Sequence, residues 1–413
     1  MEIVGHLIGG ERVTENVKTL PLNNPATGRQ EAELAMASAD QTMLAIKAAT
    51  EAYPAWRATP PAKRAQVMFR FKALLEAHVD EICALVSREH GKIPHDAAGE
   101  VQRGIENVEF ACFVPELLKG EFSKNVGPGI DSWSEFQPLG VVAGITPFNF
   151  PVMVPLWMYP LAIACGNTFV LKPSERDPSA TLYVAQLAHE AGLPPGVLNV
   201  VNGDREVVEV LLNDPAIQAV SFVGSTPVAE SVYATATNGG KRCQALGGAK
   251  NHAIVMPDAD LDNAVQALMG AAFGSSGERC MAISVAVAIG EQTATSLVEK
   301  LKAEMSSLKV GSAQDNNNDF GPLITAEHRD KVVGLITSAE REGAVIVVDG
   351  RAPKLADEDT GFFVGGTLID QVQSSMSCYR QEIFGPVLCV VHVDNLDEAM
   401  QLVDDHEYGN GTC

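Results

Sequence analysis

An alternation of short apolar runs with helical patterns constrains the fold of this chain more than any other feature of its sequence. The apolar runs occupy residues 141–145, 168–171, 197–201 and 219–223, and helical patterns occur between them at residues 180–191 and 205–212. Strands that alternate with helices pair into parallel sheets through right-handed crossovers. We therefore predict a doubly wound α/β domain of the Rossmann type, although no Gly-x-Gly-x-x-Gly fingerprint follows any of its strands.

A second alternating region begins near His252 and predicts another α/β domain. Its strand-like runs occupy residues 253–256, 284–289, 345–348, 362–369 and 387–393, and its helical patterns residues 261–273, 293–308, 326–342 and 396–404. A length of 413 residues is enough for two or three domains. We predict that residues 1–119 and 139–250 form the first domain and residues 251–413 the second, with a protruding hairpin at residues 120–138.

The N-terminal part of the chain carries helical patterns and one long uncharged stretch. Three amphipathic helices are predicted at residues 38–53, 61–91 and 96–118. Residues 136–171 carry no charge and are long enough for a membrane span, but five prolines interrupt them, four of which lie from Pro147 to Pro160. Because prolines would leave helix backbone groups unpaired in lipid, we interpret the stretch as a buried strand, a loop and the start of a buried helix.

The balance of charges and the cysteines narrow the class of protein. Lys+Arg 30 against Asp+Glu 52 gives a net charge of −22 and a pI near 4.8, which argues against nucleic acid or an anionic membrane as a partner. None of the eight cysteines forms a Cys-x-x-Cys pair, so neither a disulfide framework nor a zinc site is predicted. Because no set of metal ligands stands out, we expect no metal. The N-terminus shows no signal-peptide pattern, so we expect a cytoplasmic protein.

Cys280 is the candidate nucleophile among these cysteines. It follows a run of small residues, Gly274-Ser275-Ser276-Gly277, along which a ligand can approach the backbone closely. The neighbouring Arg279 would favour the thiolate form of Cys280. A buried structural cysteine is the simpler explanation for any one of the eight, and the loop of small residues is what favours a nucleophile here.

Asn149 is the candidate oxyanion donor. It lies in Pro147-Phe148-Asn149-Phe150-Pro151, a loop held by two prolines directly after the strand-like run at residues 141–145. Its side-chain amide could donate a hydrogen bond to a developing oxyanion. Taken alone, the same asparagine could simply stabilise a loop turn through its own backbone.

Two further segments place polar residues where predicted strands end. Lys172 and Glu175 follow the run at residues 168–171, and nucleotides bind at the carboxyl ends of parallel strands, although a solvated loop is the simpler reading. Gly224 and Ser225 follow the run at residues 219–223 and precede a helix. The first amides of that helix could bind a pyrophosphate, or Ser225 could be an ordinary helix cap.

Together with Glu382-Ile383-Phe384-Gly385-Pro386, these segments resemble the motifs of the NAD(P)-dependent aldehyde dehydrogenase superfamily, in the same order over almost the whole chain. The resemblance implies an NAD-binding first domain, a catalytic second domain and an oligomerisation hairpin. It also implies that Cys280 is the nucleophile and Asn149 an oxyanion donor. The cofactor-binding residues that it implies are Phe148, Lys172, Glu175, Arg176, Gly224, Ser225, Glu382 and Phe384.

One segment, Ala245-Leu246-Gly247-Gly248-Ala249-Lys250-Asn251, departs from the Glu-Leu-Gly-Gly-Lys pattern of hydrolytic family members. The glutamate of that pattern activates the water that releases the acyl-enzyme. One register places Leu246 at its position and another places Ala245 there, and neither side chain can accept a proton. An acyl-enzyme that water attacks slowly can instead pass its acyl group to a thiol such as coenzyme A.

Other matches, at residues 103–110, 250–252, 256–259 and 279–282, resemble the CoA-acylating methylmalonate-semialdehyde dehydrogenase branch of this superfamily. In that branch two arginines bind the substrate carboxylate, and they map to Arg103 and Arg279. Without the resemblance, an ion pair of Arg103 with Glu100 would be the simpler expectation. The resemblance implies oxidation of malonate or methylmalonate semialdehyde, loss of carbon dioxide, and formation of acetyl-CoA or propanoyl-CoA in valine or inositol breakdown.

The sequence leaves other functions open. A hydrolytic aldehyde dehydrogenase would release a free acid, a non-redox cysteine acyltransferase would need no nucleotide loops, and a scaffold would need neither Cys280 nor Asn149. The resemblance further implies a homo-oligomer, either a dimer or a tetramer. The chain stops at residues 409–413, where a strand is expected to begin, and this predicts an interruption of the chain at that point.

Overall fold

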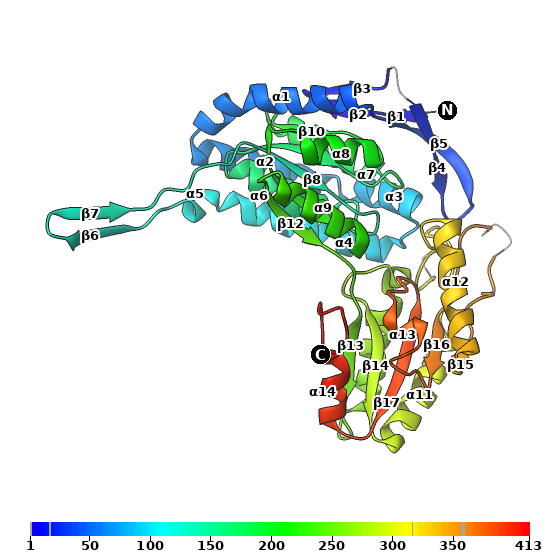
Figure 1. Ribbon diagram of the computed structural model, residues 1–413. Coiled ribbons are helices and arrows are strands. Elements are labelled where there is room, and N and C mark those ends of the chain that lie inside the picture. Colours follow the sequence, from blue (N-terminus) through cyan, green and yellow to red (C-terminus); the bar gives the residue numbers. More distant parts are fainter. Residues whose placement is uncertain (1, 16–17, 316, 357–359) are drawn as a thin grey trace. The chain divides into compact units, whose positions relative to one another are not determined.

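The computed structural model describes residues 2–15, 18–315, 317–356 and 360–413. The contacts divide the chain into two compact units (Figure 1). The first comprises residues 1–22, 30–89 and 97–247, and the second comprises residues 23–29, 90–96 and 248–413. Each unit has its own sheet and its own buried core.

The first unit is built around a seven-stranded sheet in the order β12-β11-β8-β9-β10-β2-β3. The strands from β12 to β10 are parallel, whereas β2 and β3 extend the sheet as an antiparallel edge. These strands are β2 (His6–Ile8), β3 (Glu11–Val13), β8 (Val141–Ile145), β9 (Thr168–Lys172), β10 (Leu198–Val200), β11 (Ile217–Val223) and β12 (Arg242–Leu246). The predicted parallel, doubly wound sheet is therefore confirmed.

Helices cover both faces of this sheet, and the alternation of side chains along β8 shows how. Val141 and Ile145 lie in one buried cluster with residues of α1, α8 and α9, whereas Val142 lies in another with residues of α2, α4, α6 and α7. The helices are α1 (Ala39–Ala58), α2 (Pro61–Ala77), α3 (Val79–His90), α4 (Pro94–Cys112), α5 (Val114–Leu117), α6 (Met153–Ala164), α7 (Ser179–Glu190), α8 (Arg205–Asn213) and α9 (Thr226–Asn238). A strand that is buried on both faces needs a continuous apolar run, and this explains the sequence of β8.

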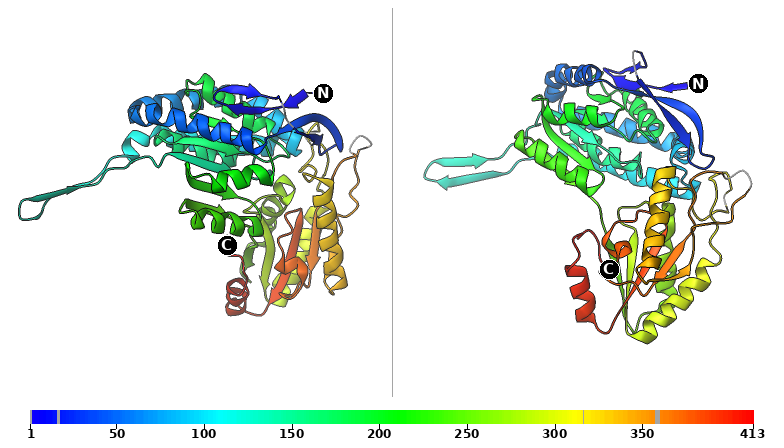
Figure 2. Two further views of the ribbon diagram at one scale, coloured as in Figure 1. Left: turned by 45° about the horizontal axis from the view of Figure 1, so that its top comes forward. Right: turned by 45° about the vertical axis from the view of Figure 1, so that its right-hand side comes forward.

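A three-stranded sheet and an exposed hairpin complete the first unit (Figures 1 and 2). The small sheet has the order β1-β5-β4, with β1 (Glu2–Val4), β4 (Lys18–Asn24) and β5 (Arg29–Met36). The hairpin consists of β6 (Phe122–Gly127) and β7 (Ile130–Trp133), and it lies where the sequence predicts it.

The second unit contains a five-stranded sheet in the order β13-β14-β17-β16-β15. Its first four strands are parallel, and β15 pairs antiparallel with β16 at the edge. The strands are β13 (Asn251–Val255), β14 (Ile283–Ile289), β15 (Val345–Val348), β16 (Thr367–Asp370) and β17 (Val387–Val393). Residues 411–413 continue beside β13, where the amides of His252 and Ile254 donate to the carbonyls of Gly411 and Cys413.

Helices also cover both faces of this second sheet. Residues of α12 and α14 share one buried cluster with alternate residues of β14 and β17, and residues of α10 and α11 share the opposite cluster. The helices are α10 (Leu261–Phe273), α11 (Glu291–Met305), α12 (Ala326–Arg341), α13 (Ser377–Arg380) and α14 (Leu396–Asp404), with the 3-10 turn η1 (Gly274–Gly277).

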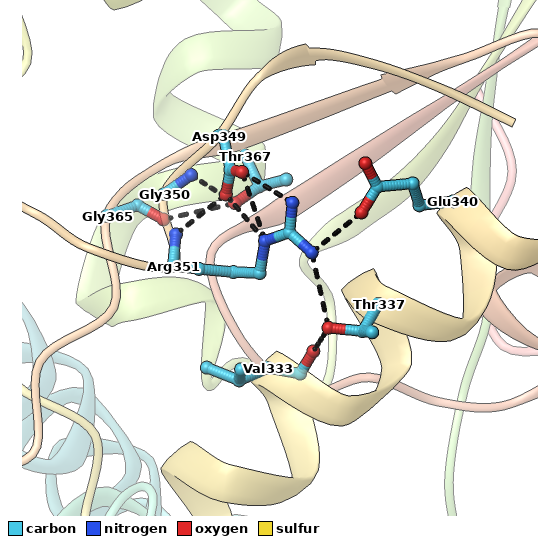
Figure 3. A network of polar contacts seen from close by, with 8 residues as sticks. All are labelled: Val333, Thr337, Glu340, Asp349, Gly350, Arg351, Gly365 and Thr367. Atoms are coloured by element: carbon cyan, nitrogen blue, oxygen red, sulfur yellow. Dashed lines mark hydrogen bonds and ion pairs between the residues drawn. The ribbon is translucent and has the colours of Figure 1, made fainter.

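Arg351 ties the end of β15 to α12 (Figure 3). Its guanidinium donates to both carboxylate oxygens of Asp349 and to Glu340 Oε2 at 2.8 Å, with a further contact to Thr337 Oγ1. These two acids raise the pKa of Arg351 above its ordinary value. The network fixes the sheet edge against the helix that covers it.

Several predicted elements are wrong in their extent, among them the helix predicted at residues 38–53, which runs on to Ala58. The predicted helix at residues 61–91 is broken at His78, which leaves helical geometry and whose ring binds Tyr183 Oη at 3.0 Å. The predicted helix at residues 96–118 is likewise two helices, separated at Phe113. The predicted strand at residues 362–369 is only β16, because the main chain of Phe362 pairs with Pro25 and Leu323.

No helix in the described part of the chain has the length and apolar character needed to cross a membrane. The uncharged stretch at residues 136–171 instead contains β8, the loop after it and α6. The interpretation of this stretch as strand, loop and buried helix is therefore confirmed.

Candidate functional site

In the first unit, the loops after three neighbouring strands carry the predicted nucleotide-binding residues. Strands β11, β8 and β9 are adjacent and parallel, so their carboxyl ends lie at one edge of the sheet. Asn149 follows β8, Lys172 ends β9, and Ser225 follows β11. The strand order thus gathers residues that are up to 76 positions apart in the chain, from Asn149 to Ser225, at a single edge.

Lys172 and Glu175 form a partly enclosed ion pair at this edge. Lys172 Nζ donates to Glu175 Oε2 at 2.8 Å, and the Lys172 side chain is almost fully buried. Burial by itself would raise the pKa of Glu175, but the Lys172 ammonium and hydrogen bonds outweigh it, so the pKa lies below the ordinary value. Glu175 is therefore a carboxylate that can accept hydrogen bonds from ribose hydroxyls. Arg176 is exposed beside it.

Ser225 stands at the start of α9 with extended backbone geometry and an exposed side chain. The amide of Gly224 donates to the carbonyl of Leu246, which fixes this turn to the end of β12. The first amides of a 13-residue helix follow at an accessible surface. A helix start of this kind favours a phosphate group.

The loop after β8 holds Phe148 and Asn149 between that strand and α6. Asn149 is buried, with only 1% of its surface exposed, whereas Phe148 is half-buried. The carboxylate of Glu100 accepts hydrogen bonds from the amides of Val152 at 2.8 Å and Met153 at 3.2 Å, which anchors the loop to α4.

Arg103 lies on α4 and is exposed. Its Nε donates to the Gly99 carbonyl, and its guanidinium carbon lies 5.8 Å from the centre of the Phe150 ring. The Glu100 carboxylate accepts from the start of α6, so the structure favours a loop anchor over the simple ion pair with Arg103 as the role of Glu100.

In the second unit, the candidate residues lie at the edge of the sheet that is formed by the amino ends of its strands. Cys280 precedes β14, the segment from Glu382 to Gly385 precedes β17, and Ala249 precedes β13, and these three strands are neighbours. Their amino ends enclose a small pocket. Its lining includes Arg279, Cys280, Glu382 and Phe384.

Cys280 lies in a loop whose main chain is tightly fixed. Its carbonyl accepts hydrogen bonds from Asn251 Nδ2 at 2.9 Å and from Asn410 Nδ2 at 3.0 Å. In the preceding turn, Ser275 and Ser276 adopt left-handed backbone angles, with φ of 50° and 57°. Strained backbone of this kind is concentrated at functional sites. The half-buried Cys280 thus reaches a pocket from a rigid loop.

Glu382 and Phe384 are held by main-chain hydrogen bonds. Glu382 Oε1 accepts from the amide of Ala249 at 3.0 Å, and burial raises the pKa of Glu382. Phe384 has a positive φ of 57°, and its carbonyl lies 2.7 Å from His328 Nε2. Burial lowers the pKa of His328, which leaves a neutral ring able to donate to this carbonyl.

Glu278 lies behind the same loops. Its Oε1 accepts from the amide of Ile324 and is 3.6 Å from His328 Nε2. Complete burial raises the pKa of Glu278 well above its ordinary value. This favours a protonated carboxyl inside the fold.

Arg279, the second predicted carboxylate-binding arginine, is engaged within its own unit. Its Nη2 lies 2.6 Å from Asp96 Oδ1, and Asp96 Oδ2 accepts from the amide of Ser275 at 2.8 Å. Asp96 was not anticipated from the sequence, because it lies 183 positions before Arg279 in the chain and no motif marks it.

The two positions that could hold the catalytic glutamate of hydrolytic members carry no proton acceptor. Ala245 and Leu246 both lie in β12, and the Leu246 side chain is 45% exposed. Lys250, a few residues later, is fully buried and donates to the carbonyls of Cys378 at 2.6 Å and Gln381 at 2.8 Å. Lys250 thereby anchors the chain that precedes Glu382. No sequence pattern predicts this role of Lys250, because its two partners are main-chain carbonyls more than 120 positions away.

Comparisons with known proteins agree with this arrangement. The model of the aldehyde dehydrogenase family matches residues 13–413. The malonate-semialdehyde dehydrogenase of Pseudomonas aeruginosa is 62% identical over 413 residues, which cover 100% of this chain and 83% of that protein.

Solved structures are also similar. The methylmalonate-semialdehyde dehydrogenase DddC of Oceanimonas doudoroffii superposes with a TM-score of 0.99 and is 67% identical, covering 100% of this chain and 85% of that chain. A structure from Sinorhizobium meliloti 1021, complexed with NAD, has a TM-score of 0.98 and 51% identity, covering 100% of this chain and 84% of that chain.

Proposed function

This chain belongs to the aldehyde dehydrogenase family, and on that basis we propose that it oxidises malonate or methylmalonate semialdehyde with NAD and transfers the acyl group to coenzyme A. The observation that carries the proposal is the pocket lined by Cys280, Arg279 and Glu382 in a chain whose base position holds Ala245 or Leu246. The pocket combines a thiol with a cation. The names of the similar proteins support the same class of substrate.

The first unit is the proposed NAD-binding domain, and its residues fit that cofactor. Glu175 would bind the adenosine ribose with Lys172, and Ser225 at the start of α9 would bind the pyrophosphate. Phe148, Arg176 and Gly224 lie beside them, and Glu382 with Phe384 would orient the nicotinamide ribose and ring. NAD would supply the acceptor for the hydride that leaves the substrate carbon. The NAD complex of a similar protein supports this assignment.

In the proposed reaction, the Cys280 thiol gives its proton to solvent and the resulting thiolate attacks the aldehyde carbon. Asn149 and the Cys280 amide would stabilise the oxyanion of the resulting hemithioacetal. Loss of hydride from that carbon leaves a thioester on Cys280. Arg279 and Arg103 would bind the substrate carboxylate as planar, permanently charged groups.

The missing base determines how the acyl group leaves Cys280. Water attack on a thioester needs a proton acceptor, and the two candidate positions hold alanine and leucine. A thiolate of coenzyme A needs no such base at the carbonyl, so it would displace Cys280 and carry the acyl group away. Release of carbon dioxide from the carboxylate leaves an enolate of the thioester, which takes up a proton from water, so the product is acetyl-CoA or propanoyl-CoA.

A direct assay tests this proposal. NADH formation from methylmalonate semialdehyde and NAD should be slow without coenzyme A and rapid with it, and propanoyl-CoA should be the product detected by mass spectrometry. Cys280→Ser should abolish NADH formation, whereas Cys243→Ser should retain it. Rapid NADH formation that yields free acid and ignores coenzyme A would contradict the acylating function and favour hydrolysis.

We also propose that the protein acts in the cytoplasm, in valine or inositol breakdown, as a homo-oligomer. The exposed hairpin β6–β7 supports the last point. Its apolar side chains include Phe122, Val126, Ile130 and Trp133, and each has more than half of its surface exposed. A second copy of the chain would cover such a surface.

A further inference from the structure

Asp96 contacts the loop of the candidate nucleophile at two points. One carboxylate oxygen lies 2.6 Å from Arg279 Nη2, and the other accepts from the Ser275 amide at 2.8 Å. The Asp96 side chain is 10% exposed and that of Arg279 is 25% exposed, so the pair is largely shielded from solvent. A shielded charge-assisted bond holds its partners more firmly than a surface pair does.

The main chain holds the guanidinium from another side. A Cβ atom added at Gly274 would lie 2.7 Å from Cζ and from both Nη atoms of Arg279. The guanidinium therefore packs directly on the backbone of Gly274, where only glycine leaves room. Asp96 and Gly274 together limit the orientations that the fork of Arg279 can adopt.

Donor capacity remains on Arg279 after these contacts. The Arg279 side chain keeps 25% of its surface exposed, and its buried Nε has no hydrogen-bond partner among the described residues. Arg279 also lines the same pocket as Cys280. An oriented fork with spare donors beside a thiol is suited to a substrate that carries both an aldehyde and a carboxylate.

We propose that Asp96 is a positioning residue that gives this enzyme its selectivity for carboxylated aldehydes by orienting Arg279. The inference rests on the proposed function, in which Arg279 binds the substrate carboxylate. If the ion pair were purely structural, its loss would affect the binding of all aldehydes alike. An aspartate that competed with the substrate would weaken carboxylate binding, and its removal would strengthen it.

Alkylation of Cys280 tests this without NAD, coenzyme A or turnover. Iodoacetate carries a carboxylate and iodoacetamide does not, so the ratio of their rates at Cys280 measures carboxylate recognition beside the thiol. Peptide mass spectrometry separates Cys280 from the other seven cysteines. The ratio cancels changes in thiol exposure that affect both reagents.

Asp96→Asn keeps an oxygen acceptor for the Ser275 amide but loses the charge that holds Arg279. We expect this variant to lower the ratio by about tenfold, the effect of losing one well-aligned charge-assisted hydrogen bond. Arg279→Gln should lower it at least as much, and the double variant should match Arg279→Gln alone. Removal of a negative charge would by itself favour iodoacetate, so net charge cannot produce this fall.

The matched control is Asp370→Asn. Asp370 forms a partly buried pair with His392 at 2.7 Å in the same unit, away from the residues that line the pocket. This variant should leave the ratio unchanged.

A kinetic measurement complements the alkylation ratio. Asp96→Asn should raise the KM for the semialdehyde acid far more than the KM for propanal.

The remaining outcomes would overturn the inference. An unchanged or increased ratio in Asp96→Asn, with a lowered ratio in Arg279→Gln, would show that Asp96 does not orient the arginine. An unchanged ratio in both variants would also remove Arg279 from carboxylate binding. In each case the coenzyme A-dependent assay of the unmodified enzyme still decides the proposed function separately.

Discussion

Buried cationic and histidine side chains of the second unit act on main-chain atoms of the loops around Cys280. Lys250 binds the carbonyls of Cys378 and Gln381, and His328 binds the carbonyl of Phe384. Burial lowers the pKa of Lys250, and its hydrogen bonds to two carbonyls offset part of that cost. None of these three contacts involves a side-chain partner, so no pairing of residue types in the sequence predicts them.

His252 gives a residue-scale prediction about pH. Burial, followed by the neighbouring His406, lowers its pKa from the ordinary 6.5 to about 4, and its Nε2 lies 3.0 Å from Tyr379 Oη. At a pH between these two pKa values, His252 binds a proton in the unfolded chain but not in the folded chain. The folded state is therefore destabilised by protonation of the unfolded chain as the pH falls from 6.5 towards 4. Lowering the pH from 7 to 5 should therefore cost about 2 kcal/mol through this group.

Urea unfolding at pH 7 and pH 5 measures the effect. His252→Gln keeps a donor for Tyr379 but cannot titrate, so its loss between the two pH values should be smaller than that of the unmodified protein by about 2 kcal/mol. His6, whose pKa is also lowered to about 4, is present in both proteins and cancels. Equal pH dependence in the two proteins would contradict the buried neutral His252.

At the scale of elements, the two units carry their candidate residues at opposite kinds of sheet edge. The first unit uses loops at the carboxyl ends of β11, β8 and β9, and the second uses loops at the amino ends of β13, β14 and β17. The carboxyl edge follows from the sequence, because nucleotides bind there in parallel sheets. The amino edge has no comparable rule, and only the pairing of β14 with β13 and β17 brings its loops together.

Glu100 gives an element-scale prediction. It is completely buried, and its carboxylate accepts from the first amides of α6. Glu100→Ala would leave two buried amides without that acceptor, so the free energy of unfolding should fall by about 3 kcal/mol. Glu100→Gln retains an oxygen acceptor and should lose about 1 kcal/mol.

The control is Gln102→Ala on the exposed face of the same helix, which should change stability little. Denaturant unfolding measures all three variants. If Glu100→Ala is no less stable than Gln102→Ala, Glu100 does not anchor α6. Because Asn149 lies three residues before Val152, loss of this anchor should also lower kcat in the aldehyde assay.

At the scale of the whole molecule, the hairpin β6–β7 is a surface that a single chain leaves uncovered. All ten residues of the two strands are exposed or half-buried, and Trp133 is 72% exposed. A two-stranded hairpin has two open edges and is marginally stable alone in water. This supports the proposal that copies of the chain cover it in a dimer or tetramer.

Sedimentation tests this prediction. Replacing Ile130 and Trp133 with serine should convert the oligomer to smaller species at micromolar concentration, because a large apolar contact is lost. Met400→Gln, at an exposed apolar position of α14, is the control and should sediment as the unmodified protein does. A hairpin variant with unchanged sedimentation would show that the assembly uses another surface.

The sequence by itself determined the parallel sheets, the hairpin and the residues that carry the proposed chemistry. Apolar periodicity reports which segments become strands and helices, and short motifs such as the one around Cys280 are contiguous in the chain. Parallel strands share a direction, so their carboxyl ends lie at one sheet edge. The sequence therefore also placed Asn149, Lys172 and Ser225 at that edge.

Only the tertiary structure decided how these residues are held. Asp96 reaches Arg279, His328 reaches Phe384, and Lys250 reaches the carbonyl of Cys378 across large separations in the chain. The shortened β16 has the same origin, because the main chain of Phe362 pairs with Pro25 and Leu323, which lie far away in the sequence. Such contacts depend on strand order and packing, and local propensity carries no information about either.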